Sequence, residues 1–377
     1  MLYLYGANIV QKHCFLFSMG DTINIGDAIK INNDIYQIIE LLDKGAFGLV
    51  YKVLKMGAYH FSVLKLIETT KDKVIWLTKN EISTLEWLTK QLDNVSPFVK
   101  LEEYQYIPKN GTPLFAIIME YIDGPNLAKY IKTNTMTHSL IKTLFRQILL
   151  AVNILHTCEI VHRDLKLENI MVVIDKNGDF RVVLIDFGLS CNRNPLFLSK
   201  YIENKGTIRI SQTCTSSKAG TPYTLAPEVI LNDKLTFEQL KATDVWSLGV
   251  ILYCMVYSKF PYSFTNPKTI DKNLKQLHRN LEDTPTSFTP ILKSIFVMNN
   301  RPTIVDLIKQ YGLFLGLPTA SQSSITLPSI SFVSSLDKIN SDASRPSPKS
   351  IPELSPFTLP RRVKPKETSL ELPALKQ

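Results

Sequence analysis

The chain has 377 residues, and 45% of them are hydrophobic, which is enough for two packed lobes and an additional tail. Its five cysteines are scattered and form no Cys-x-x-Cys pair, which argues against a disulfide framework or a zinc site. The formal charge of +9 suits an acidic partner, but no basic run is interleaved with aromatic residues, so nucleic-acid binding is not expected.

No apolar run approaches the roughly 18 residues of a membrane span. Residues 1–20 also lack the charged start, apolar block and cleavage site of a secretory signal. We therefore expect an intracellular protein, cytoplasmic and also nuclear if a basic patch near the C-terminus acts in import.

The first predicted element is a hairpin that contains glycines. Tyr36–Lys44 and Leu49–Val53 are predicted as strands, with Gly45–Gly48 as the turn. Glycines there let backbone N–H groups approach phosphates without a Cβ in the way. The hairpin resembles the glycine-rich loop of protein kinases, G-x-G-x-x-G-x-V, but Asp43 replaces the first glycine. The resemblance makes nine residues candidate nucleotide contacts: Leu42, Asp43, Lys44, Gly45, Ala46, Phe47, Gly48, Leu49 and Val50. An ordinary hairpin is the alternative.

A third strand and a helix follow. Phe61–Ile67 is predicted as the strand, and Lys65 within it is costly to bury unless it is paired. Thr70–Gln91 carries an apolar stripe at helical spacing. By the resemblance, Lys65 binds the α/β-phosphates and Glu81 is its ion-pair partner, with Glu86 as the competitor. A surface lysine and a solvated helix face are the alternatives.

The strand predicted over Leu114–Met119 runs into a segment that resembles the hinge between kinase lobes. The resemblance implies that backbone groups near Glu120 and Ile122 bind the adenine edge. Met119 then limits the back pocket, or is simply a core residue. Thr137–His156 is predicted as a long amphipathic helix that leads to the next motif.

That motif is His162–Asn169, which reads H-R-D-L-K-L-E-N and resembles the catalytic loop of protein kinases. Phosphoryl transfer needs a carboxylate that receives the proton of the attacking hydroxyl, and Asp164 fits this role. Lys166 adds positive charge where the transferred phosphoryl is most negative. The Asn169 amide offers an oxygen ligand for magnesium. A solvated loop whose aspartate caps a helix is the alternative.

Asp186–Gly188 reads D-F-G and follows two predicted strands, Val172–Ile174 and Val182–Ile185. A carboxylate between a β-branched strand end and a glycine suits magnesium held between phosphates. Asp186 and Asn169 are therefore the candidate metal ligands, and ATP and Mg²⁺ are the expected cofactors. A simple strand-end turn is the alternative.

Ser190–Thr224 is long, polar and rich in hydroxyl groups, with an insertion expected around residues 192–209, and Ala226–Glu228 closes it as A-P-E. Such a segment suits an order–disorder switch. Arg163 offers a positive site for a phosphate on it. The candidate phosphate acceptors are Thr213, Thr215, Ser216 and Ser217. A solvated loop is the alternative for each of them.

Two later motifs complete the resemblance, which covers Tyr36–Tyr311. Asp244, in a helix predicted from Thr243 to Tyr257, resembles the aspartate that anchors the catalytic loop. Arg301 resembles the partner of Glu228. The resemblance implies an α+β, two-lobed protein-kinase fold, with a β-rich N-lobe over about 36–120 and a mainly helical C-lobe over about 121–312.

The ends of the chain are predicted to lie outside this fold, as an N-terminal extension over 1–35 and a disordered tail over 313–377. Nine of the 21 prolines and 13 serines fall in the tail, and no helical period is sustained there. Ser347-Pro348 and Ser355-Pro356 are candidate sites for proline-directed kinases, and Arg361–Lys366 is a candidate import or docking patch. A solvated linker without a partner is the alternative.

The motifs resemble serine/threonine protein kinases through Lys166 and Gly220–Pro222, and most nearly the calmodulin-dependent and energy-sensing group. This implies transfer of the γ-phosphate of ATP to protein substrates, with an upstream kinase as a further partner. Glu168 is a candidate reader of basic residues near the acceptor, although Asn126 stands where a second acidic reader is expected. Three alternatives stay open. One is a pseudokinase scaffold, for which only Asp43 argues. The second is a small-molecule phosphotransferase, a class that lacks the A-P-E segment. The third is an interaction protein whose kinase domain is secondary, a view that the tail alone supports. The sequence leaves the oligomeric state open.

Overall fold

The computed structural model describes residues 14–15, 23–45, 48–58, 60–92, 96–109, 112–193, 219–262 and 267–317. The chain divides into two units, Met1–Ser329 and Ile330–Gln377, and all described residues lie in the first. Ala46 and Phe47, the four candidate phosphate acceptors and the predicted tail motifs lie outside the described residues.

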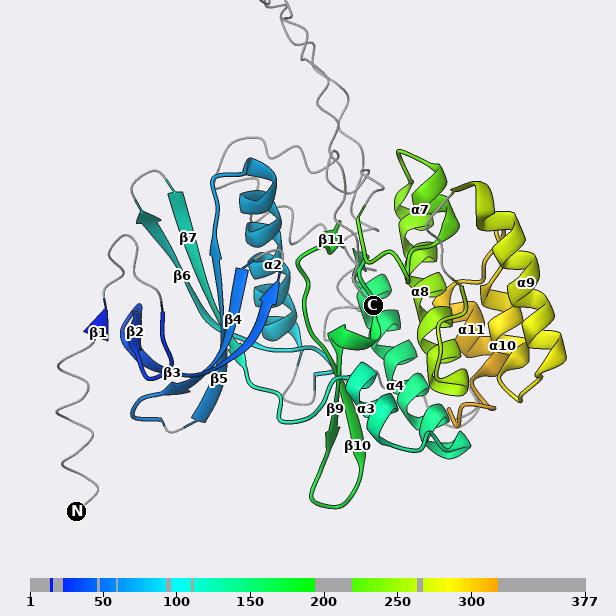
Figure 1. Cartoon of the computed structure of the whole chain (residues 1–377), viewed down its shortest axis with the longest axis horizontal. Helices are drawn as coiled ribbons and strands as arrows, with labels where there is room; N and C mark the ends of the chain where they lie inside the picture. The colour runs from blue at the N-terminus through cyan, green and yellow to red at the C-terminus, as the bar shows by residue number, and fades with distance from the viewer. Residues whose placement is uncertain are drawn as a thin grey trace, which may run out of the picture. The chain divides into compact units, whose positions relative to one another are not determined.

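The N-terminal part is a seven-stranded sheet with the order β1-β2-β3-β4-β5-β7-β6 (Figure 1). Its strands are β1 (Cys14–Phe15), β2 (Ala28–Ile31), β3 (Asp34–Gly45), β4 (Gly48–Lys55), β5 (His60–Glu68), β6 (Leu101–Lys109) and β7 (Thr112–Glu120). All pairs are antiparallel except β1 with β2. The four strands predicted within β3, β4, β5 and β7 are confirmed.

Among the described strands of four or more residues, β2 and β6 were not predicted. β2 joins the sheet upstream of Tyr36, so the sheet begins within the stretch predicted as an extension. β6 carries four charged or amide side chains and a proline among its nine residues, and only its pairing with β7 makes it a strand. The turn after β2 also contacts β6, because Asn32 donates from its backbone to Gln105 at 3.0 Å and from its side chain to Glu103 at 2.7 Å.

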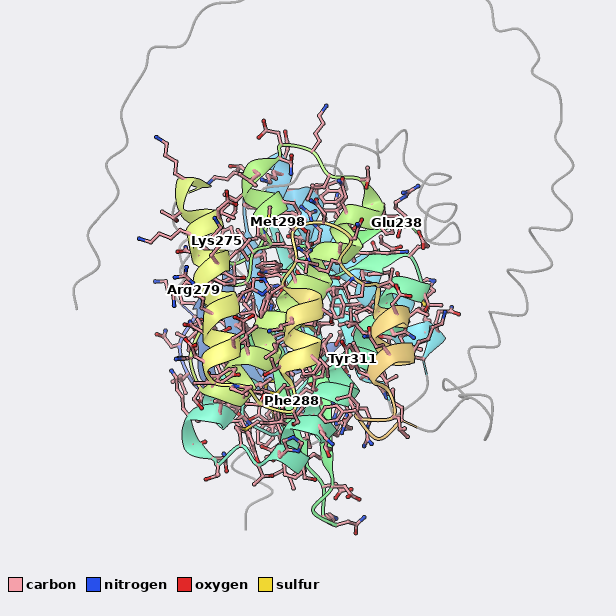
Figure 2. All side chains as sticks on the ribbon, turned by 90° about the vertical axis from the view of Figure 1, so that its right-hand side faces the viewer. Glu238, Lys275, Arg279, Phe288, Met298 and Tyr311 are labelled. Atoms are coloured by element: carbon pink, nitrogen blue, oxygen red, sulfur yellow. The ribbon has the colours of Figure 1, made fainter. Side chains whose placement is uncertain are left out.

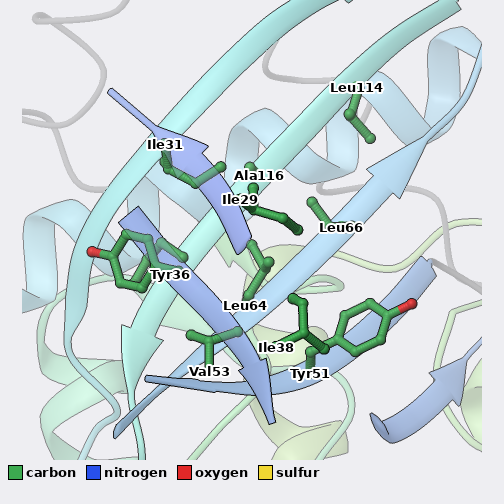
Figure 3. Close-up of a cluster of buried hydrophobic side chains, with 11 residues drawn as sticks. Ile29, Ile31, Tyr36, Ile38, Tyr51, Val53, Leu64, Leu66, Leu114 and Ala116 are labelled. Carbon is green, nitrogen blue, oxygen red and sulfur yellow. The ribbon is translucent and has the colours of Figure 1, made fainter. Parts of the chain in front are cut away.

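One face of this sheet buries an apolar cluster (Figure 3). The cluster draws its residues from five strands: Ile29, Ile31, Tyr36, Ile38, Tyr51, Val53, Leu64, Leu66, Leu114, Ala116 and Ile118. Its members alternate along β3, β4 and β5, as the two-residue period of a strand requires. Each large side chain stabilises the fold by about 1.5–3 kcal/mol through removal from water. The other face of the same strands is thereby left to line the site described below.

Helix α2 (Asp72–Gln91) follows β5, and its buried apolar residues include Leu77, Ile82, Leu85 and Leu88 of the predicted stripe. The helix begins two residues later than predicted, after Lys71, which lies in extended backbone. The Leu101 N–H donates to the Thr89 hydroxyl at 3.0 Å and ties the last turn of α2 to β6.

The remaining described residues are mainly helical. The helices are α3 (Leu127–Thr133), α4 (His138–Thr157), α7 (Pro227–Leu231), α8 (Phe237–Tyr257), α9 (Ile270–Asp283), α10 (Thr289–Ile295) and α11 (Ile304–Tyr311), with the short 3₁₀ turns η1 (Leu167–Asn169) and η2 (Pro267–Thr269). Small strand pairs are formed by β9 (Ile170–Ile174) with β10 (Phe180–Leu184) and by β8 (Ile160–Val161) with β11 (Cys191–Asn192). The long helix α4 and the β9–β10 hairpin confirm the predictions.

Helix α8 begins at Phe237 rather than Thr243, because Thr236 and Gln239 form a capping box ahead of the predicted start. By length and composition alone α8 is apolar enough to cross a membrane, but 78% of its most apolar window is buried, as in the core helix of a folded domain. Helices α9, α10 and α11 pack beyond it, and α9 exposes Lys275 and Arg279 (Figure 2).

Two further findings differ from the sequence-based expectations. Leu315 and Leu317 are buried, and Arg146 donates to the Gly316 carbonyl at 3.1 Å, so the packed chain continues beyond the predicted boundary at Gly312. Cys191 is disulfide-bonded, whereas no bridge was expected.

Candidate active site

The predicted catalytic loop is held by a buried carboxylate. Asp244 of α8 is 1% exposed and accepts hydrogen bonds from the backbone N–H groups of His162 at 2.9 Å and Arg163 at 2.8 Å. The His156 ring adds a third contact at 3.0 Å. Arg163 has a φ of 67°, a left-handed conformation that costs a non-glycine residue about 1–3 kcal/mol. The anchor therefore fixes a strained backbone directly before Asp164, as the sequence predicted for Asp244.

Asp164, Lys166 and Asn169 converge in space. The Lys166 ammonium lies 2.7 Å from Asp164 Oδ2, and Asn169 Nδ2 donates to the Asp164 carbonyl at 2.9 Å. Asp164 and Asn169 are 7% and 5% exposed. Within its own loop, the carboxylate of Asp164 is thus oriented at Oδ2 by Lys166, and Asn169 holds the Asp164 backbone. The structure brings the three predicted catalytic residues together, and their catalytic roles stay predictions.

Thr221 also belongs to this cluster. Its hydroxyl donates to Asp164 Oδ1 at 2.7 Å and accepts from Lys166 at 3.1 Å. The sequence had marked Thr221 only as part of a Gly-Thr-Pro triplet, because the contact spans more than 50 residues of chain and has no local signal. It links the end of the segment before A-P-E to the catalytic carboxylate.

A second constellation surrounds Lys65. Its ammonium lies 2.7 Å from Glu81 Oε1 and 3.4 Å from Asp186 Oδ1, and the Lys65 side chain is 10% exposed. Burial alone would lower the pKa of Lys65, but the charges of Asp186 and Glu81 outweigh burial and raise this pKa above its usual value. Glu86, the competitor, pairs instead with Lys90 at 2.6 Å. Lys65 therefore stays charged and held near the D-F-G turn.

Asp186 is placed by its own backbone and by its neighbour. It has a φ of 64°, and its carboxylate accepts from the Gly188 N–H at 3.2 Å. Burial would raise the pKa of Asp186, but Lys65 and the Gly188 N–H lower it below its usual value. Phe187 is fully buried and packs on the rings of His162 and Phe98, with centroids 5.1 and 5.9 Å away. The turn is thereby fixed with an ionised Asp186 directed toward Lys65.

Two side chains of the glycine hairpin, those of Asp43 and Val50, lie on the same face of the sheet as Lys65. Asp43 pairs with Val50 across β3 and β4, and Val50 pairs with Lys65 across β4 and β5. Residues directly opposite each other in antiparallel strands point to one face, so these three side chains form a row. At Gly48, with a φ of 139°, a Cβ would lie 2.0 Å from the Leu66 carbonyl oxygen, so only glycine fits.

Most of the predicted nucleotide contacts in this hairpin are described. Lys44 pairs with Leu49 and Gly45 with Gly48, which brings the two strands to the tip of the hairpin. Leu42 is exposed on the same strand. Ala46 and Phe47 lie outside the described residues.

The predicted hinge follows β7. Met119 and Ile122 are 8% and 7% exposed, and the Glu120 N–H donates to the Lys100 carbonyl at 3.0 Å. The carbonyl of Glu120 and the backbone of Ile122 are therefore the groups suited to adenine. At Gly124 a Cβ would lie 2.2 Å from the carbonyl oxygen of Val172, so the end of the hinge packs directly on β9.

The A-P-E motif is anchored as predicted. Arg301 donates to Glu228 through two nitrogens at 2.5 and 3.2 Å, and also to the carbonyls of Ala242 and Val297. The side chain of Arg301 is 3% exposed. This bidentate, buried arrangement fixes α7 and thus the end of the preceding segment.

The two candidate substrate readers differ. Asn126 accepts a hydrogen bond from the Lys129 N–H and caps α3, so it serves a structural role. Glu168 accepts a hydrogen bond from the hydroxyl of Tyr223, and burial together with Glu168 raises the pKa of Tyr223. Of these two positions, only Glu168 thus supplies an acidic group.

Comparison with known proteins agrees with this geometry. The family described as "Protein kinase domain" matches residues 36–327. A probable serine/threonine-protein kinase KIN1 homolog of Enterocytozoon bieneusi is 29% identical over 78% of this chain and 44% of its own length. The kinase KIN4 of Saccharomyces cerevisiae is 32% identical over 71% of this chain and 32% of its own length. Calcium-dependent protein kinase 5 of Plasmodium falciparum is 31% identical over 68% of this chain and 40% of its own length.

The chain thus spans less than half the length of these relatives. The match nevertheless includes both constellations described above, around Lys65 and around Asp164. The fold, the motifs in their order and the family match together show that the chain belongs to the protein kinase family, among relatives named as serine/threonine kinases.

Proposed function

We propose that the protein transfers the γ-phosphate of ATP, bound with Mg²⁺, to serine and threonine hydroxyls of protein substrates. The observation that carries the proposal is the joint placement of Lys65, Glu81 and Asp186, with Asp164 and Lys166 held in the neighbouring cluster. An inactive arrangement of the family would separate Lys65 from Glu81 or turn Asp186 away.

The residues fit a magnesium ion held together with a nucleotide. Asn169 uses Nδ2 to bond Asp164, which leaves its Oδ1 for a cation, and Asp186 supplies a carboxylate. Among the residues that the structure describes, no group of three or more His, Cys, Asp or Glu side chains could hold a metal alone. Two oxygen ligands suit Mg²⁺, which keeps several waters and binds phosphate oxygens.

Each residue then has a distinct task. Lys65 binds the α/β-phosphates and is held for this by Glu81. Asp164 accepts the proton of the attacking hydroxyl, and Lys166 stabilises the negative charge of the transferred group. The magnesium ion supplies charge neutralisation of the phosphates when it is bound. Backbone groups of Glu120 and Ile122 bind the adenine.

The preference for serine and threonine in proteins follows from the surroundings of Asp164. Lys166 and Thr221 lie together beside the Asp164 carboxylate. Tyrosine kinases differ from this chain in the two motifs that carry these residues. The Glu228–Arg301 pair anchors the segment that a protein substrate contacts, and small-molecule phosphotransferases lack it. We keep the calmodulin-dependent and energy-sensing group as a prediction, because the relatives carry names from several kinase groups.

Control by the segment Ser190–Thr224, here called the activation segment, is part of the proposal. Arg163 lies directly before Asp164, and a phosphate on the segment would pair with its guanidinium. Burial lowers the pKa of Arg163, while Asp244 opposes this change. An upstream kinase is the expected partner, and Glu168 is the proposed reader of basic residues near the acceptor. The proposed location is cytoplasmic, and also nuclear if the basic patch Arg361–Lys366 acts in import.

The test is transfer of labelled γ-phosphate from ATP to a basic protein substrate, followed by hydrolysis and identification of the phosphorylated amino acid. We expect phosphoserine and phosphothreonine, dependence on Mg²⁺, and loss in Lys65→Met. Nucleotide binding without transfer, even after phosphorylation of the activation segment, would instead favour the pseudokinase scaffold.

A further inference from the structure

A polar contact that the catalytic motifs do not include joins α2 to the segment after the D-F-G turn. Asn80 Nδ2 donates to the Ser190 carbonyl oxygen at 2.8 Å and lies 3.3 Å from Ser190 Oγ. Ser190 is 1% exposed, and its hydroxyl is 3.5 Å from Thr84 Oγ1, one turn further along α2. A single turn of the helix thus holds both the backbone and the side chain of Ser190.

Asn80 acts at the point where α2 meets the turn that carries Asp186. It directly precedes Glu81, the partner of Lys65. Ser190 closes the turn, because its N–H donates to the Phe187 carbonyl at 3.0 Å. The helix also packs closely here, since a Cβ on Gly188 would lie 3.4 Å from a Glu81 oxygen.

The same contact reaches the catalytic loop through a strand pair. Ser190 is followed by β11, in which Cys191 pairs with Val161 of β8. β8 in turn runs directly into His162-Arg163-Asp164. A path made of the Asn80–Ser190 hydrogen bond, the peptide link to Cys191 and the β11–β8 strand pairing therefore leads from α2 to the base of the catalytic loop.

We propose that Asn80 is a positioning residue that couples the Lys65–Glu81 pair to the D-F-G turn and the catalytic loop. The proposal deepens the proposed function, on which its kinetic test rests. If α2 moves outward, the buried Ser190 carbonyl loses its side-chain donor, and an unsatisfied buried acceptor is costly. Asn80 thus favours the arrangement in which Lys65, Glu81 and Asp186 are together.

The test replaces Asn80 with leucine, which has a similar size and no donor. We expect faster hydrogen exchange in Asn80→Leu at two places together, in α2 around residues 78–86 and at Cys191–Asn192. We also expect kcat to fall by about fivefold to thirtyfold, the range that a lost buried hydrogen bond predicts. The KM for the protein substrate should stay within about twofold, since Asn80 does not face it.

Three variants separate this role from a merely structural one. Lys79→Leu alters an exposed neighbour on the same helix and should leave exchange and kcat unchanged. Ser190→Ala keeps the bond from Asn80 to the carbonyl and should lose much less activity than Asn80→Leu. Asn80→Gln keeps the amide donor and should recover part of the loss. If Asn80→Leu does not fold, Asn80→Ala replaces it.

The proposal is overturned if exchange at Cys191–Asn192 stays at the wild-type rate while α2 loosens, or if kcat does not change. Exchange is measured without turnover, so the two proposals fail separately. A wild type that transfers no phosphate would refute the proposed function, while the exchange at Cys191–Asn192 would still decide the role of Asn80.

Discussion

Replacing Glu81 with glutamine removes the charge that balances a buried lysine and keeps the volume of the side chain. The Lys65 and Glu81 side chains are 10% and 2% exposed. Removing one partner of a fully buried ion pair costs about 3–5 kcal/mol, because the other charge is left without compensation. Here Asp186 remains 3.4 Å from Lys65, and the glutamine oxygen still accepts a hydrogen bond. We therefore expect a loss of about 1–2 kcal/mol in the free energy of unfolding.

Activity should fall further than stability suggests. Without the charge of Glu81, Lys65 turns toward Asp186 and leaves the position from which it binds the phosphates. We expect kcat/KM for ATP to fall by about 10- to 100-fold, which is about 1.4–2.7 kcal/mol of transition-state stabilisation. The assays are thermal unfolding and steady-state kinetics on the same preparations.

The chain offers a matched control on the same helix. Glu86→Gln removes the same charge from a partly exposed i,i+4 pair with Lys90, a kind of pair that contributes about 0.3–0.5 kcal/mol. It should leave kcat/KM unchanged. If Glu81→Gln and Glu86→Gln behave alike in both assays, the assignment of Glu81 as the functional partner of Lys65 is wrong.

Three other substitutions test the site and its frame. Asp43→Gly removes a carboxylate from the row that leads to Lys65. This change should tighten the binding of ATP by about threefold to tenfold, while the binding of uncharged adenosine stays the same. Equal changes for both ligands would contradict a charge effect. Arg301→Met leaves the Glu228 carboxylate partly buried without its partner and should lower the free energy of unfolding by about 2–4 kcal/mol in denaturant titrations; a loss below about 0.5 kcal/mol would contradict the pairing. The pKa of Asp186 is lowered in the folded protein, so its carboxylate stabilises the fold at pH values above the usual pKa of about 3.9, and this contribution is lost as the pH falls. Asp186→Asn should therefore flatten the dependence of stability on pH below about pH 4. An unchanged slope would show that Asp186 does not contribute.

The catalytic residues were predictable because their signals are local. Asp164, Lys166 and Asn169 lie within six residues, and the loop that carries them is short enough for spacing alone to identify it. The choice of Glu81 over Glu86 also followed from sequence position, and the structure agrees through the 2.7 Å pair with Lys65.

Contacts between distant segments were not predictable in the same way. Thr221 reaches Asp164 and Asn80 reaches Ser190 only after the chain has folded, and neither contact leaves a periodic or spaced pattern. Strand β6 was missed because its edge position tolerates the four charged or amide side chains and the proline that interrupt its apolar pattern. Helix α9 could have been predicted, since Ile270, Leu274, Leu277 and Leu281 repeat at helical spacing.

The central claim is that Asp164 accepts the proton of a hydroxyl that attacks the γ-phosphate of ATP. The most direct test is single-turnover transfer of labelled γ-phosphate to a protein substrate by the wild type and by Asp164→Asn, with bound nucleotide measured in the same samples. We expect equal nucleotide binding and a fall of about 100-fold or more in the transfer rate of Asp164→Asn. Transfer at the wild-type rate by this variant would show that Asp164 does not accept this proton.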